Sequence, residues 1–197
     1  MAEVLPINFP YPTENVIASY DFLDFASGFG YRKLYLANAT NATTPYFFLT
    51  PQTIESDYLS VSLSGTRADD FDITFSNKVE IQGDAYICST MQTSGGSSIN
   101  VTFTLKKVTG AGTTTLASAV TGTLAASTVG VRTVLLDAIP LTSFAPGDIL
   151  RISASSVVAG TGFYFIDPSG RTSLTESGTA ASVSGTTFIL LPFKIHQ

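Results

Sequence analysis

The stretch Ile99-Asn100-Val101-Thr102-Phe103-Thr104-Leu105-Lys106 alternates apolar and polar side chains without a break. Successive side chains of a β-strand point to opposite faces, so this alternation predicts a strand with one face on a core and the other toward water or a partner. Thr109-Gly110-Ala111-Gly112 follows, and its glycines suit the positive φ of a hairpin loop. This part of the chain is therefore expected to form antiparallel β-structure.

Short apolar runs separated by turn residues continue through most of the chain, which is typical of all-β proteins. Pro146-Gly147 fits the central positions of a type II turn, with the glycine taking the positive φ. Residues 13–25 are expected to form at most a short helical turn or two. We predict an all-β fold, an antiparallel, jelly-roll-like β-sandwich, with strands at 31–36, 46–49, 58–63, 71–75, 79–90, 99–108, 113–120, 132–136, 149–155, 162–165 and 187–195.

The chain has 197 residues, which suits one β-sandwich domain, and we assign it to residues 31–197. Residues 1–30 are expected to form an extended N-terminal arm and a loop, because prolines at positions 6, 10 and 12 cannot sit inside a sheet. The arm carries three apolar side chains, Ile7, Phe9 and Tyr11. Two placements remain open: these side chains bind a partner chain, or they pack along their own domain.

Charge is sparse in this sequence. Only 13% of residues are charged, about half the usual share, while Ser and Thr make up about a quarter of the chain. Large neutral areas suit burial in an assembly. The net charge is −5 and no basic stripe is present, which disfavours direct binding of nucleic acid. No apolar run reaches the length of a membrane span, and the first residues lack a signal peptide. We therefore expect synthesis in a cytoplasm.

Catalytic chemistry finds little support in these residues. The only histidine, His196, lies beside the C-terminus, where an organised base for a Ser-His-Asp or Cys-His system is not expected. The only cysteine, Cys88, lies in an apolar run and is expected to be an inert buried thiol. One histidine and one cysteine exclude a structural zinc site within one chain. We expect no enzyme activity, no catalytic residues and no cofactor.

Two acidic segments deserve separate interpretations. Asp69-Asp70-Phe71-Asp72 offers carboxylates for calcium, but it lacks a calcium-loop frame and is expected to be a solvated turn. A strand beginning at Phe71 would place Asp70 and Asp72 on one face and Asp69 on the other. Gly83-Asp84 interrupts a strand, and a glycine there predicts a β-bulge rather than a site.

Three stretches together resemble a known group of proteins: residues 19–36, residues 144–152 (Phe-Ala-Pro-Gly-Asp-Ile-Leu-Arg-Ile) and the tail Leu191-Pro192-Phe193-Lys194-Ile195. The pattern is similar to that of the jelly-roll-like, β-sandwich accessory capsid proteins of tailed phages and related viruses, which decorate or cement a capsid lattice. The resemblance implies a sandwich module, often trimeric, on a viral shell. It implies no catalytic residues.

The leading functional hypothesis is a decoration or cement protein of a virion, whose partners are the major capsid protein or another virion subunit. We expect a homo-oligomer, a trimer, with Ile7, Phe9 and Tyr11 as candidate partner-binding residues. The alternative is a receptor- or carbohydrate-binding head domain of a viral fibre, or a lectin-like module, which should show an aromatic-lined pocket or a calcium cluster. A small β-barrel hydrolase is the third and weakest hypothesis.

Overall fold

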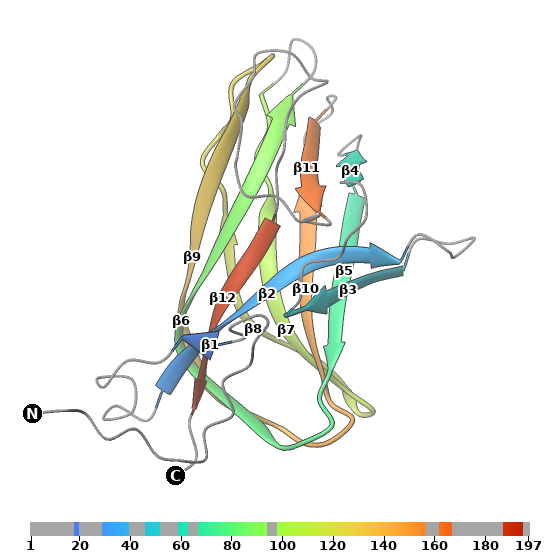
Figure 1. Cartoon of the computed structure of the whole chain (residues 1–197), viewed down its shortest axis with the longest axis vertical. Coiled ribbons are helices and arrows are strands. Elements are labelled where there is room, and N and C mark those ends of the chain that lie inside the picture. The colour runs from blue at the N-terminus through green and yellow to red at the C-terminus, as the bar shows by residue number, and fades with distance from the viewer. Residues whose placement is uncertain are drawn as a thin grey trace, which may run out of the picture.

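The computed structural model describes residues 18–19, 29–39, 46–51, 59–62, 67–93, 98–156, 162–166 and 187–194. Every regular element in these ranges is a strand (Figure 1). The strands are β1 (Ala18–Ser19), β2 (Phe29–Ala39), β3 (Tyr46–Thr50), β4 (Leu59–Ser62), β5 (Arg67–Thr74), β6 (Val79–Thr93), β7 (Thr102–Thr109), β8 (Gly112–Val120), β9 (Val129–Phe144), β10 (Ile149–Ser156), β11 (Gly162–Ile166) and β12 (Thr187–Lys194).

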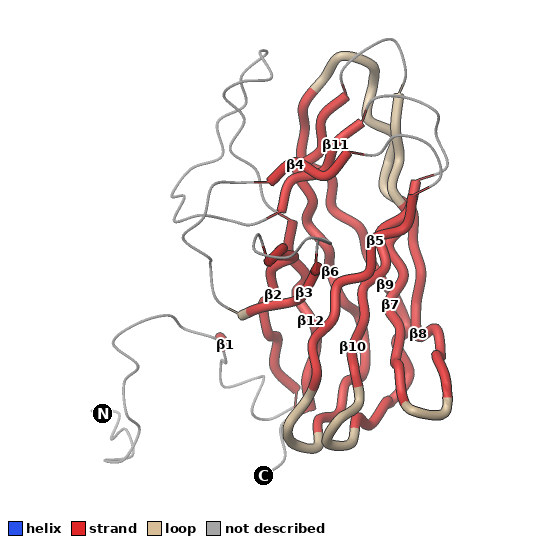
Figure 2. Tube along the Cα trace, turned by 90° about the vertical axis from the view of Figure 1, so that its right-hand side faces the viewer, coloured by secondary structure: helices blue, strands red, loops and turns tan. Residues whose placement is uncertain are grey.

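The strands form one continuous hydrogen-bonded path that folds over into two layers. The order is β4-β11-β6-β12-β2-β3-β5-β10-β7-β8, with β9 added to β6 and β1 added to β2. Figure 2 views the layers from the side, with β2 and β12 on the left and β7 and β8 on the right. The long strand β2 joins the layers, since its first half pairs with β12 and its second half pairs with β3.

The predicted all-β sandwich is confirmed. One strand pair departs from the antiparallel prediction, because β3 runs parallel to β5 where Phe48 lies opposite Asp72. The chain forms β4 between β3 and β5, so these two strands are joined by a crossover and not by a tight hairpin. A parallel pair requires such a crossover.

The core lies between the two layers and is built from the side chains that point inward from each strand. The alternation that opens the sequence analysis is confirmed: Ile99, Val101, Phe103 and Leu105 are all fully buried. They face apolar residues of the opposite layer, including Leu34, Leu36, Ile87 and Ile189. Aromatic rings add to this core, with Phe71 at 4.9 Å from Phe47 and 6.3 Å from Tyr164 between ring centroids. Burial of apolar area of this kind is the main favourable term in folding.

Strand β9 is much longer than the predicted strand 132–136. Two β-bulges let its pairing with β6 continue through residues that are typical of turns. Asp84 alone lies opposite Asp137 and Ala138, and Gln82 alone lies opposite Pro140 and Leu141. Residues that are unpaired in a bulge need not donate to the ladder, so Pro140 is tolerated there. The ladder is irregular at Gly83 as predicted, and this residue has a φ of +107°, but the extra residues of both bulges belong to β9 and not to β6.

Two predicted turns are also confirmed. The amide of Asp148 donates to the Ala145 carbonyl at 3.0 Å, and Gly147 between them has a φ of +93°, as a type II turn requires. At the other hairpin, Thr109 pairs with Gly112 across the two-residue connection Gly110-Ala111. The first turn connects β9 to β10, which pair with different neighbours, and the second fixes the register of β7 with β8.

The N-terminal predictions are tested only in small part. Within the expected helical segment 13–25 the structure describes Ala18 and Ser19, and these form strand β1, so the helical prediction is wrong at these residues. Ile7, Phe9 and Tyr11 lie outside the described residues, as do residues 170–185. The division into an arm at 1–30 and a domain at 31–197 stays a prediction.

Candidate binding face

The outer side of β2, β12, β6 and β9 carries an unusual set of side chains, and strand register decides which residues share it. Leu190 lies opposite Lys33 on one neighbour and opposite Tyr86 on the other, and Tyr86 lies opposite Leu135. One row further along, Phe188 lies between Tyr35 and Cys88. We call this surface the aromatic face, defined by Tyr31, Lys33, Tyr35, Tyr86, Leu135 and Phe188.

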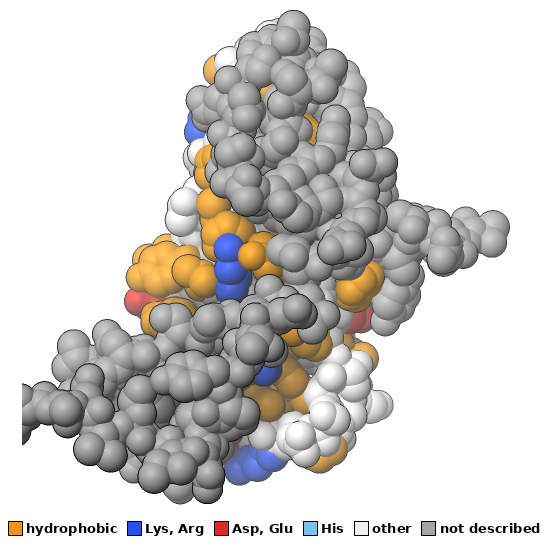
Figure 3. Space-filling model, in the orientation of Figure 1, with side chains coloured by type: hydrophobic (Ala, Val, Ile, Leu, Met, Phe, Trp, Pro, Cys, Tyr) orange, Lys and Arg blue, Asp and Glu red, His pale blue; other side chains and the backbone are white. Residues whose placement is uncertain are grey.

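Three residues of the aromatic face are exposed despite their large apolar side chains. Tyr31 and Tyr86 are each 38% exposed and Leu135 is 45% exposed. The rings of Tyr31 and Tyr86 lie 6.4 Å apart between centroids, tilted by 48°. Because β12 lies between β2 and β6, the two rings meet across the outer side of β12. In Figure 3 orange side chains gather on the described part of this view, around a blue cationic group.

Lys33 is held within the aromatic face by two rings. Its Nζ lies 4.0 Å from the ring centroid of Phe188 and 4.8 Å from that of Tyr35. A cation over an aromatic ring is attracted by the negative charge of the ring face. The rings of Tyr35 and Phe188 are thus already engaged by this cation.

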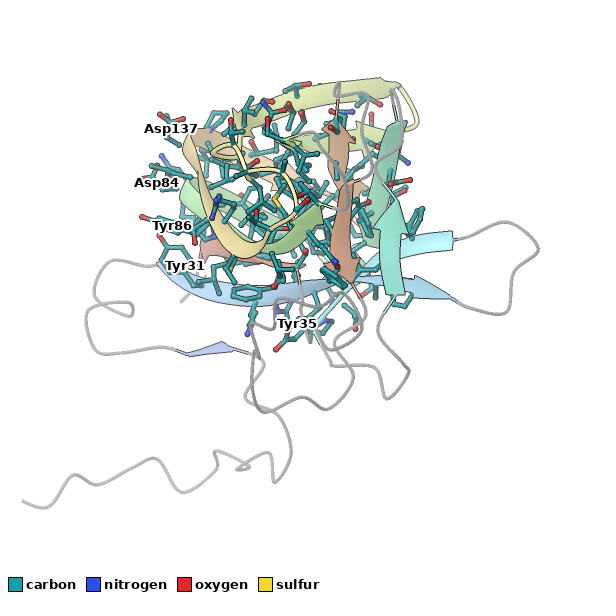
Figure 4. The ribbon with its side chains drawn as sticks, turned by 90° about the horizontal axis from the view of Figure 1, so that it is seen from above. Tyr31, Tyr35, Asp84, Tyr86 and Asp137 are labelled. Atoms are coloured by element: carbon teal, nitrogen blue, oxygen red, sulfur yellow. The ribbon has the colours of Figure 1, made fainter. Side chains whose placement is uncertain are left out.

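Two carboxylates lie beside the tyrosine pair, both at the Tyr86 end. Asp84 is two residues before Tyr86 on β6, and Asp137 is two residues after Leu135 on β9, so both carboxylates share the outer side. Figure 4 shows Asp137, Asp84, Tyr86 and Tyr31 following one another along one side of the molecule.

The bulge at Ala138 fixes the Asp84 carboxylate. The Ala138 amide donates to Asp84 Oδ1 at 2.9 Å, and Ala138 adopts a left-handed φ of +52°. Asp84 Oδ2 accepts no hydrogen bond in the part of the chain that the structure describes. The bulge therefore directs one lone acceptor oxygen toward the exposed side of the sheet.

Cys88 lies on the aromatic face and is half-buried, so the prediction of a buried thiol is wrong in its burial. The strand phase explains the difference, because Ile87 takes the core side and its neighbours point outward. Desolvation raises the pKa of the Cys88 thiol, although a hydrogen bond with Thr133 and the charge of Lys33 act in the opposite direction. The neutral thiol is the favoured form at neutral pH, and thiols react as thiolates.

The outer side of the other layer has a different character. Arg151 on β10 donates to both carboxylate oxygens of Asp72, at 2.7 and 2.6 Å, and its Nη1 lies 3.0 Å from Asp70 Oδ2. Ser153 donates to Asp70, and Lys106 donates to Ser153 at 2.7 Å. On this side, Arg151 of β10 is therefore paired with carboxylates of β5, and Lys106 of β7 has a hydroxyl partner on β10.

The segment Asp69–Asp72 is part of strand β5, so the expected solvated turn is wrong. The predicted split of its carboxylates is confirmed: Asp70 and Asp72 share the outer side, and Asp69 points inward. Asp69 is 5% exposed and accepts a hydrogen bond of 2.7 Å from the Tyr164 hydroxyl. A buried carboxylate requires such a donor, which gives Asp69 a structural role.

The predictions on catalytic and metal-binding residues concern some residues that the structure describes and some that it does not. His196 lies outside the described residues. Among the residues that are described, no group of three or more His, Cys, Asp or Glu side chains is placed to hold a metal ion. No helix in the same ranges has the length and apolar character needed to cross a membrane.

Sequence reasoning missed the aromatic face entirely. Tyr31 and Tyr86 are distant in sequence, and only the order β2-β12-β6 brings them together. Asp137 lay beyond the end of a predicted strand, and its place beside Asp84 depends on the bulge. The sole available signal was the outward phase of Tyr86 in the run 79–90, and the bulge at Gly83 obscured that phase.

No family model and no curated protein matches this chain. Among solved structures, the chain is similar to a CocE/NonD family hydrolase from Staphylococcus aureus, with a TM-score of 0.60 and 13% identity over 85% of this chain and 37% of that chain. This chain therefore spans little more than a third of the hydrolase's length. At this identity the likeness shows the fold alone.

Two further solved structures are less similar. One is the CBM22-1 xylan-binding domain of Paenibacillus barcinonensis Xyn10C, with a TM-score of 0.37 and 12% identity over 86% of this chain and 88% of that chain. The other is infectious bursal disease virus, strain Gx, with a TM-score of 0.22 and 12% identity over 81% of this chain and 46% of that chain. Likenesses at these TM-scores carry no conclusion about fold or function.

Proposed function

We propose that this chain is a non-enzymatic structural protein of a virus particle, which decorates a capsid lattice and stabilises it. Its partners are the major capsid protein or another virion subunit. The observation that carries this proposal is the position of β1, where Ala18 and Ser19 pair with Arg32 and Tyr31 of β2. This pairing ties the root of the proline-rich arm to the sheet.

The arm then acts as the attachment segment. Ile7 lies eleven positions before the root at Ala18, and an extended chain over that many steps spans at most about 36–40 Å. Ile7, Phe9 and Tyr11 dock on a neighbouring subunit of the shell. The prolines of the arm limit its conformational freedom when it is unbound, so ordering it on a partner costs less entropy.

The sandwich assembles as a closed homo-oligomer, a trimer in the first instance. Closed point groups are the norm for homo-oligomers. A surface with few charges also loses little solvation when it is buried. Several arms on one oligomer would bind together, since each bound arm raises the effective concentration of the next.

The experiment is co-sedimentation of the purified chain with virus particles assembled without it. Saturable binding at a fixed ratio to the major capsid protein supports the proposal, and light scattering of the free chain gives its oligomeric state. Free capsid subunits serve as the control, because a lattice-specific protein prefers the assembled shell. Absence of saturable binding to the particles contradicts attachment.

A second candidate function is a carbohydrate- or receptor-binding head domain. The observation that favours it is the pair Tyr31–Tyr86 beside Asp84 and Asp137 on the aromatic face. This arrangement is an exposed row on a sheet rather than the aromatic-lined pocket or calcium cluster that the sequence led us to expect. The two functions are compatible, because an arm-attached module can present its sheet face to solvent.

A further inference from the structure

The aromatic face holds a pair of stacking surfaces on rigid elements. Tyr86 lies on β6, which is flanked by β9 and β12, and Tyr31 lies on β2, which is flanked by β1 and β12. Strand pairing on both sides fixes their backbone, so binding a ligand would order little more than the rings themselves. Aromatic side chains on such a support supply large contact areas at low entropic cost.

Three of the four carboxylate oxygens beside these rings have no donor among the described residues. Asp137 forms no hydrogen bond or ion pair within the part of the chain that the structure describes, and Asp84 uses only Oδ1, toward the Ala138 amide. Carboxylate oxygens that remain partly hydrated accept hydrogen bonds from hydroxyl groups. The site thus combines an apolar platform with acceptors at its edge.

We propose that Tyr31, Tyr86, Asp84 and Asp137 form a binding site for a neutral polysaccharide. The C–H face of a sugar ring packs on the two tyrosine rings, while its hydroxyl groups donate to Asp84 Oδ2 and to the Asp137 carboxylate. Leu135, opposite Tyr86, extends the apolar platform toward β9. This site rests on the second candidate function, for which it names the ligand class, and it does not depend on attachment to a capsid.

Charge distinguishes this ligand from other occupants. Two carboxylates on a chain of net charge −5 repel an anionic polymer, which disfavours nucleic acid and acidic glycans. A protein docked over the same face would bury both carboxylates and would need cations to pair with them, since unpaired buried charge is costly. A sugar chain leaves the carboxylates partly hydrated, so it avoids this penalty.

Lys33 limits the site to the tyrosine pair. Its ammonium group lies over the rings of Phe188 and Tyr35 and covers the ring faces that a sugar would otherwise contact. A sugar on the neighbouring rings meets this cation only at its margin. The same positive charge disfavours a Lys or Arg side chain of a protein partner as the occupant of the tyrosine pair.

The test is affinity electrophoresis of the purified chain in native gels that contain soluble glucan, mannan, galactan or xylan, with polygalacturonate as the acidic counterpart. We expect retardation by at least one neutral polysaccharide and none by polygalacturonate. Tyr86→Ala should weaken that binding at least tenfold, whereas Tyr86→Phe, which keeps the ring, should stay within about threefold of wild type. Asp137→Ala should weaken it at least threefold, since it removes an acceptor.

Val120→Ala is the matched control, because Val120 is 56% exposed on β8 in the other layer and should leave binding unchanged. Thermal melting of each variant verifies its fold. Absence of retardation by all four neutral polysaccharides overturns the proposal, as does binding that Tyr86→Ala leaves intact. A dimer that Tyr86→Ala dissociates, without polysaccharide binding, also overturns it and assigns the face to a second copy. Particle co-sedimentation of Tyr86→Ala should match wild type, so failure of this site leaves capsid attachment separately testable.

Discussion

The hydrogen bond between Tyr164 and Asp69 joins two buried polar groups from β11 and β5. Because Asp69 is 5% exposed, water cannot replace a donor that is removed. We expect Tyr164→Phe to lower the free energy of unfolding by about 1–3 kcal/mol, the cost of leaving a buried acceptor short of a donor. Denaturant unfolding measures the loss. Tyr86→Phe is the control, because its ring is exposed, and a loss equal to that of the control would contradict a structural role for this bond.

Asp148 links the turn after β9 to the hairpin strand β7. Its Oδ2 lies 2.9 Å from Lys107 Nζ and accepts a hydrogen bond from the Ala145 amide. The hydrogen bond from Lys107 lowers the pKa of this carboxyl below its ordinary value of 3.8, and the bond from Ala145 acts in the same direction. The ionised form is therefore favoured by folding, and its contribution to stability is full above pH 3.8.

This linkage predicts a pH dependence. The stability difference between wild type and Asp148→Asn should be constant at pH 5 and above, and it should shrink as the pH falls below 3.8 through the lower, folded-state pKa. Urea unfolding of both proteins from pH 7 to pH 2.5 measures it. A difference that grows at acid pH would mean that the carboxylate is destabilised by folding, opposite to the direction given by its contacts.

At the scale of elements, the start of β11 packs closely on the segment before β7. A Cβ atom on Gly162 would lie 2.8 Å from both Cδ1 and Cγ2 of Ile99, which is fully buried. We expect Gly162→Ala to destabilise the fold by about 1–3 kcal/mol, because the core cannot expand without strain. Gly110→Ala is the control, since no atom lies within 4 Å of its added Cβ. Equal melting temperatures for the two variants would contradict close packing at Gly162.

Local sequence patterns predicted most elements because the strand period and the turn residues are local signals. Ile99 to Leu105 alternates by two, and Pro146-Gly147 supplies both backbone angles of its turn. The extent of β9 could not be predicted in the same way. Asp137-Ala138 and Pro140 resemble a chain break, and only pairing with β6 shows that they are bulge residues.

The candidate site is less predictable than the elements, because it depends on strand order. Tyr31 and Tyr86 meet only because β12, from the end of the described chain, inserts between β2 and β6. The glycine before Asp84 predicted a bulge, and Asp84 lies opposite one, although the extra residue belongs to β9. Its acceptor role became visible only when the bulge placed Ala138 against one of its oxygens.

At the scale of the whole molecule, the two outer faces of the sandwich are different surfaces. On the face of β5, β10 and β7, charged side chains pair across strands, as Arg151 does with Asp70 and Asp72. The face of β2, β12, β6 and β9 exposes Tyr31, Tyr86 and Leu135 instead. A face with paired ions suits permanent contact with water, and an exposed apolar face marks a binding surface.

Deletion of residues 2–12 separates attachment from folding. If Ile7, Phe9 and Tyr11 dock on the shell, three buried side chains at roughly 1.5–3 kcal/mol each give several kcal/mol before the entropy of ordering is subtracted. We expect the deleted protein to melt at nearly the wild-type temperature and to bind particles at least tenfold more weakly. A sharp fall in melting temperature with unchanged particle binding would place the arm on its own domain.

The most direct measurement of particle membership is quantitative mass spectrometry of purified virions beside the lysate that produced them. We expect this chain to be enriched in the virions at a fixed molar ratio to the major capsid protein, and to keep that ratio through a further density-gradient step. A chain that is abundant in the lysate and absent from gradient-purified virions would contradict the assignment as a structural protein of the particle.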